Sequence, residues 1–160
     1  MSDKKLIFII VAEQGFISTL QDENNASLNP QNEILFGAIT QTYIPLLNML
    51  SKLENEKIPF KLSLVLSPVT CTLLKNEEIQ RLYIEYLDRR IALGDEELER
   101  NKNDSQLLDL CRKQITAFQK CRVDFIDTYK QDLVAKFKEF VKKKYILSNI
   151  FLFKFIFSLF

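Results

Sequence analysis

The chain has 160 residues, which suits one domain of ordinary size with a buried core. Lys and Arg number 22 and Asp and Glu number 21, so the formal net charge of +1 argues against a basic nucleic-acid binder. The chain has no histidine, which excludes a Ser-His-Asp nucleophile system, a histidine general base and a histidine-ligated zinc site.

Glycine, proline and cysteine usage narrow the class further. Three glycines and four prolines are too few for an all-β sandwich or barrel, so we expect mostly helices with a few buried strands. The cysteines Cys71, Cys111 and Cys121 are odd in number and form no CxxC pair, which indicates neither a structural zinc site nor a disulfide framework. The apolar stretch Leu6–Ala12 is too short to span a membrane, and no cleavage pattern follows it. A cytoplasmic protein with reduced thiols and no metal or cofactor is therefore expected.

The first part of the chain predicts a strand, a long loop and a helix. Leu6–Val11 is a continuous apolar run, typical of a strand buried on both faces, and a polar stretch follows it as far as residue 32. Asn29-Pro30 is a suitable helix start, because asparagine caps a helix and proline fits its first position. The helical pattern runs to about Asn55, and Pro45 is expected to kink or split the helix.

A second strand and three further helical patterns follow. The alternation of Phe60–Leu66 predicts the strand, and Ser67 is expected to cap a short helix after it. Asn76 opens the next helix, in which Gly94 marks a weak point or a close contact. A long apolar stripe begins at Ser105 and runs to Phe140, with a possible break near residues 127–130. Cys111 belongs to this stripe and is interpreted as core, whereas Cys121 lies beside it and has no assigned role.

The last segment changes character. Tyr145–Phe160 is rich in phenylalanine, is shorter than the ~20 residues that span a bilayer, and is interrupted by Lys154. Its alternation is strand-like and indicates a tendency to aggregate. The basic run Lys136–Lys144 before it fits a solvated helix face, or less readily a surface attracted to anionic membrane.

Four segments in this order resemble the N-terminal part of glycoside hydrolase family 57, in the branch of the intracellular α-amylases and 1,4-α-glucan branching enzymes. They are Leu35–Leu47 (LFGAITQTYIPLL), Lys61–Pro68 (KLSLVLSP), Tyr83–Arg100 (YIEYLDRRIALGDEELER) and Tyr129–Phe140 (YKQDLVAKFKEF). In that branch the first strand usually ends in a motif like His-Ala-His-Leu-Pro-Phe. Here Ala12 and Phe16 match it, but Val11 and Glu13 stand at the two histidine positions.

The resemblance implies an α/β fold: an N-terminal fragment of a (β/α)7 barrel, helix-rich, with two or three parallel strands. Residues 1–144 would be the barrel portion, with a third strand beginning near Lys143, and residues 145–160 an apolar tail that does not match the family. The tail looks like the product of a truncated or frameshifted gene.

Active sites of such barrels lie at the carboxyl ends of the strands. Glu13, Gln14 and Phe16 would sit at that rim and are the candidate substrate-binding residues, although Glu13 also fits a solvated loop acid. No catalytic residue is assigned, because the family's Glu nucleophile and Asp general acid lie on later strands. The resemblance therefore implies an α-glucan partner and a piece that is inactive alone.

A different class of function fits the tail alone. A small helical protein could bind a partner or a membrane surface through the apolar residues 145–160. We favour the glucan-processing interpretation, because it accounts for most of the chain.

Overall fold

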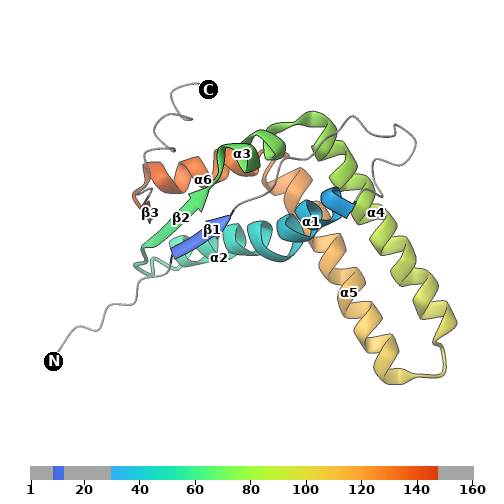
Figure 1. The fold of residues 1–160 in the computed structure, drawn as a ribbon. Helices are drawn as coiled ribbons and strands as arrows, with labels where there is room; N and C mark the ends of the chain where they lie inside the picture. Colours follow the sequence, from blue (N-terminus) through green and yellow to red (C-terminus); the bar gives the residue numbers. More distant parts are fainter. Residues whose placement is uncertain (1–8, 13–29, 148–160) are drawn as a thin grey trace.

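The computed structural model describes residues 9–12 and 30–147, which form a small parallel sheet surrounded by helices (Figure 1). The elements in chain order are β1 (Ile9–Ala12), α1 (Pro30–Ala38), the π-helical turn η2 (Ile39–Tyr43), α2 (Ile44–Asn55), β2 (Leu62–Leu66), α3 (Pro68–Lys75), α4 (Glu77–Arg100), α5 (Ser105–Val123), the π-helical turn η3 (Asp124–Thr128), α6 (Leu133–Lys142) and β3 (Ile146–Leu147).

The three described strands are parallel and lie in the order β1-β2-β3. In the register, Ile10 faces Leu64 and Leu62 faces Ile146. Parallel strands need long crossover connections, and helices supply both of them here. The prediction of a helix-rich α/β chain with two or three parallel strands is confirmed for the described part of the chain.

The expected break at Pro45 is present as the turn η2. In this turn the Ile44 amide donates to the Ile39 carbonyl, one residue farther back than in an α-helix. Proline has no amide proton to donate, and its ring would collide with the carbonyl four residues earlier. The wider turn just before Pro45 accommodates both effects, so the helix divides into α1 and α2.

Side-chain caps start the helices after β2 as the sequence indicates. The Ser67 hydroxyl accepts from the Thr70 amide at 3.1 Å at the start of α3. The Asn76 carbonyl oxygen accepts from the Ile79 amide at 3.0 Å at the start of α4. These caps satisfy amides that have no partner within the helix.

Helices α4 and α5 form a long hairpin that projects from the rest of the fold (Figure 1). Gly94 lies where the two helices meet, because a Cβ at this position would come within 2.5 Å of Ile115 Cγ1. The expected close contact at Gly94 is thus confirmed.

The core lies between the sheet and the helices. Its largest fully buried side chains are aromatic: Phe36, Tyr83, Phe125, Phe137 and Phe140. One sequence interpretation is wrong here: Cys121 is in the core with 8% exposure, whereas Cys111 is only partly buried.

Cys121 is buried because the apolar stripe of α5 continues from Phe118 by three residues to Cys121, and not by four residues to Arg122. Arg122 instead reaches Asp88 on α4, with its Nε 2.6 Å from a carboxylate oxygen. The predicted interruption near residues 127–130 is confirmed, because η3 and a turn separate α5 from α6.

Among the described residues, one helical stretch, Asn32–Asn55, is long and apolar enough to cross a membrane by length and composition. Leu35, Leu47 and Leu50 on this stretch are buried in the protein core. A core helix passes the same test, so the stretch gives little support to a membrane span.

Candidate functional site

The carboxyl ends of β1 and β2 are paired, with Ala12 facing Leu66, so the two strands end at one edge of the sheet. Helix α3 begins directly beyond this edge. Its Ser67 and Thr70 hydroxyls lie 2.9 Å apart, and Thr70 is fully buried. Ser67 therefore directly follows the last residue of β2 and caps α3, as the sequence indicates.

The three predicted substrate-binding residues, Glu13, Gln14 and Phe16, lie outside the described residues. Their assignment stays a prediction. Glu33 lies in the first turn of α1, where an acid suits the helix dipole. Its Oε1 lies 3.5 Å from Arg89 Nη2 and 3.6 Å from Arg90 Nη2 on α4. This acid thus ties two helices together.

The part of the chain that the structure describes contains no candidate metal-binding site. No group of three or more His, Cys, Asp or Glu side chains is placed there so that it could hold an ion.

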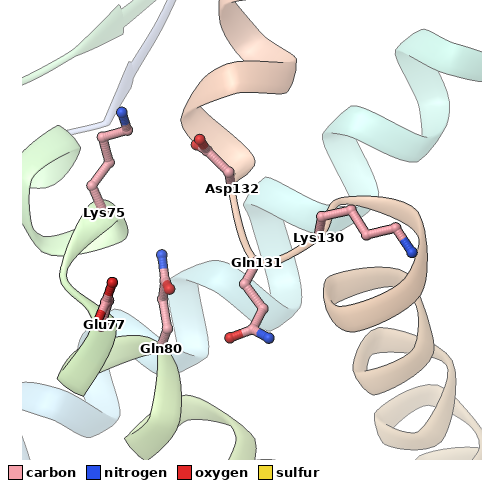
Figure 2. A pocket seen from close by; sticks show the side chains of 6 residues that line it. All are labelled: Lys75, Glu77, Gln80, Lys130, Gln131 and Asp132. Carbon is pink, nitrogen blue, oxygen red and sulfur yellow. The ribbon is translucent and has the colours of Figure 1, made fainter. Parts of the chain in front are cut away.

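A polar pocket of about 440 Å³ lies where the junction of α3 and α4 meets the connection from η3 to α6 (Figure 2). Its size falls in the range of small-ligand pockets. Its lining residues are all polar: Lys75, Glu77, Gln80, Lys130, Gln131 and Asp132.

The backbone on the α6 side of the pocket has an unusual conformation. Lys130 and Gln131 both have positive φ, at 50° and 63°. Residues other than glycine adopt this backbone conformation at a cost in free energy. The Gln131 amide donates to the Phe125 carbonyl at 2.9 Å, and the Asp132 amide donates to the Tyr129 carbonyl at 2.9 Å. These bonds hold the connection in place.

Sequence analysis missed this pocket. Its six residues come from two stretches about 50 residues apart, 75–80 and 130–132, and polar residues at such spacings show no period. The one local signal is Asp132, whose side chain accepts from the Ala135 amide at 2.9 Å and caps α6. The positive φ angles carry no signal at all, because neither position is Gly or Asn.

A buried pair of hydroxyl groups, from Thr40 and Tyr83, lies in the core, and neither residue lines the pocket. The Thr40 and Tyr83 oxygens lie 2.9 Å apart, and Thr40 also donates to the Phe36 carbonyl at 2.8 Å. Burial raises the pKa of Tyr83 well above its usual range. The Cys121 thiol donates to the Thr40 carbonyl at 3.6 Å, and burial also raises its pKa. These groups stay protonated at neutral pH and form part of the core.

A second polar cluster joins α2 to η3. The Asn48 amide donates to an Asp124 carboxylate oxygen at 2.6 Å, and Lys120 Nζ lies 2.9 Å from the same oxygen. The Tyr129 hydroxyl donates to the Asn48 carbonyl oxygen. Burial, with Asp124 adding to it, raises the pKa of Tyr129 to about 12. Each member has a partner, so the cluster is a structural tie.

No protein-family model matches the chain. A 1,4-α-glucan branching enzyme of Thermococcus kodakarensis is 26% identical over 114 residues, which are 71% of this chain and 16% of that enzyme. The crystal structure of a GH57-type branching enzyme from Pyrococcus horikoshii superposes with a TM-score of 0.78 at 25% identity, covering 88% of this chain and 25% of that one.

The crystal structure of the α-amylase AmyC from Thermotoga maritima shares the fold with a TM-score of 0.75 at 21% identity, over 88% of this chain and 26% of that one. The chain thus spans only about a quarter of the length of the two solved structures. The resemblance inferred from the sequence is confirmed: over most of its length this chain resembles part of the branching enzymes and amylases of glycoside hydrolase family 57.

Proposed function

We propose that the chain supplies the front of a (β/α)7 barrel in an α-glucan-processing enzyme of the α-amylase or 1,4-α-glucan branching type. The observation that carries the proposal is the superposition on the Pyrococcus horikoshii branching enzyme, which covers 88% of this chain. The chain would then act in carbohydrate metabolism in the cytoplasm, on an α-glucan substrate and without a cofactor.

The burial of β2 supports a barrel origin. Leu62, Leu64 and Leu66 are buried, whereas Ser63 and Val65 between them are partly exposed. Successive side chains of a strand point to opposite faces of the sheet. One face thus packs on the helices, and the other has the partial cover expected of a barrel interior that further strands would close.

The division of the chain is part of the proposal, with residues 1–144 as the barrel portion and residues 145–160 as an apolar tail. The boundary falls just before β3. The Leu62 amide donates to the Tyr145 carbonyl at 3.0 Å, and Ile146 is buried beside β2. Because this pairing extends the sheet to residues 146–147, it favours a barrel portion that ends a few residues later than residue 144, after β3. In the closed barrel, Glu13, Gln14 and Phe16 after β1 would contact the glucan.

The chain alone is proposed to be inactive. Retaining glycosidases need two carboxyl groups about 5–5.5 Å apart across the scissile bond. Among the described acids, Glu33 is paired with Arg89 and Arg90, and Asp124 with Asn48 and Lys120.

The first test is turnover. Pure chain is incubated with amylose, and reducing ends and new branch points are measured beside the Pyrococcus horikoshii enzyme as a positive control. We expect no activity above that of a mock purification. Activity that co-purifies with the chain and falls in Glu13→Gln would contradict the proposed inactivity.

A chimera tests the barrel origin independently of activity. This chain replaces the superposed quarter of the Pyrococcus horikoshii enzyme, and a matched chimera carries the corresponding segment of the Thermotoga maritima amylase. We expect both chimeras to be soluble monomers with cooperative melting. A chimera with this chain that stays insoluble while the matched one folds would refute the proposal.

A further inference from the structure

We propose that the polar pocket between the α3–α4 junction and the η3–α6 connection binds one neutral sugar ring. This site goes beyond the proposed function, because none of its lining residues lies on a strand or directly follows one. It would act as an accessory site for carbohydrate, built from helix ends and a connection and not from the strand ends.

The chemistry of the lining matches a ring that carries several hydroxyl groups. Each hydroxyl donates one hydrogen bond and accepts others, so its site needs both kinds of group. The pocket offers carboxylates of Glu77 and Asp132 as acceptors, the ammonium of Lys75 as a donor, and the amides of Gln80 and Gln131, which do both.

The balance of charge does not favour an anion such as phosphate. The ammonium groups of Lys75 and Lys130 are matched by the carboxylates of Glu77 and Asp132, and in Figure 2 the Lys130 side chain runs away from the other five. The lining therefore has no net positive charge that would attract an anion. Two carboxylates without a third acidic, His or Cys ligand also fall short of the clusters that hold a metal ion.

The Gln80 side chain and the Gln131 backbone are positioned by bonds that do not need a ligand. The Gln80 side-chain amide donates to the Leu74 carbonyl at 2.9 Å, which fixes its direction at the end of α3. Gln131 projects from a backbone at φ 63° that its bond to Phe125 holds in place. Side chains fixed before binding lose less entropy when a ligand arrives.

The affinity is expected to be weak, with a Kd on the order of 1 mM, because none of the described lining residues has an aromatic ring for a sugar to stack on. The experiment is an NMR titration of the 160-residue chain with maltotriose, with parallel titrations of glucose and inorganic phosphate. We expect shifts of the amides of residues 75–80 and 130–132 with both sugars and none with phosphate.

Two variants test the assignment. Gln131→Gly removes the amide and relieves the positive φ, and Glu77→Gln removes one charge with the same shape; each is expected to weaken maltotriose binding at least fivefold. Lys57→Gly is the matched control, because it also removes a side chain at positive φ (56°) but lies outside the pocket. It is expected to bind like the unaltered chain.

Three outcomes would overturn the site: no sugar-dependent shifts up to 50-fold above the expected Kd, on the order of 50 mM; shifts confined to other residues; or binding unchanged in both pocket variants. Phosphate binding in place of sugar would assign the pocket to an anion and refute it too. Circular dichroism of each variant confirms folding. None of these results bears on the chimera, so the barrel proposal stands or fails separately.

Discussion

Lys57 and Lys144, each just after the end of an α-helix, occupy backbone positions that suit glycine better. At the end of α2, the Lys57 amide donates to the Glu54 carbonyl at 3.0 Å and the Ile58 amide to the Leu53 carbonyl at 2.9 Å. This pair of bonds is the Schellman motif, which requires a residue with positive φ after the helix, and Lys57 has φ 56°.

Lys144 repeats the arrangement after α6 at φ 63°, with its amide 2.9 Å from the Val141 carbonyl. We expect Lys57→Gly and Lys144→Gly each to raise the free energy of unfolding by roughly 0.5 to 1 kcal/mol, because the relief of the left-handed strain exceeds the added freedom of the unfolded chain. Urea denaturation measures the change.

Lys113→Gly is the control for these lysines. Lys113 is exposed within α5, where glycine should lower the free energy of unfolding by about 1 kcal/mol. If Lys57→Gly and Lys144→Gly destabilise the chain as Lys113→Gly does, the strain argument is wrong.

At the scale of elements, the contact between α4 and α5 depends on Gly94. Its missing side chain leaves room for Ile115, which is 7% exposed, and a Cβ there would lie 2.5 Å from Ile115 Cγ1. We expect Gly94→Ala to destabilise the chain by about 1 to 3 kcal/mol, the usual cost of overpacking, despite the better helix propensity of alanine.

Two further variants make this prediction specific. Gly37→Ala in α1 meets nothing within 4 Å, so it should stabilise the chain by up to about 1 kcal/mol. Gly94→Ala combined with Ile115→Ala should cost less than the sum of the two single changes, because the second change removes the clashing atoms. Thermal and urea unfolding of the four proteins give the coupling, and additive losses would count against it.

The elements that the sequence predicted are those with local signals. Ser67 and Asn76 start helices because their side chains cap adjacent amides, and Pro45 disturbs a helix because it lacks an amide proton. Cys121 was missed because a helical stripe can continue from Phe118 by three or by four residues, and only the partner helix decides which. Arg122 pairs with Asp88 on α4, which is 34 residues away in the sequence, so the local pattern carries no sign of this contact.

The candidate site was harder to predict than the fold for a related reason. Lys130 and Gln131 adopt positive φ because bonds to Phe125 and Tyr129 carbonyls hold the connection after η3, and no glycine marks it. Whether Glu13, Gln14 and Phe16 contact a glucan rests on the family motif, and they lie outside the described residues.

At the scale of the whole molecule, the sheet is open. Among the described strands, β1 and β3 each have one paired neighbour, so each presents an unpaired edge within residues 9–12 and 146–147. The face of β2 that carries Ser63 and Val65 is only partly covered. Unpaired edges and partly exposed apolar faces favour association between copies of a chain.

We therefore expect the isolated chain to associate as its concentration rises. Val65→Lys should shift the equilibrium toward the monomer, because a charge on the open face opposes contact between copies and leaves the helix-packed face intact. Size-exclusion chromatography with light scattering measures the mass of each species. Leu64→Lys is the matched control on the opposite face: Leu64 is 3% exposed, so an unpaired charge there should unfold the chain. An unaltered chain that stays monomeric and melts cooperatively at high concentration would show that the sheet is closed by other means, and the open-barrel interpretation of β2 would then fail.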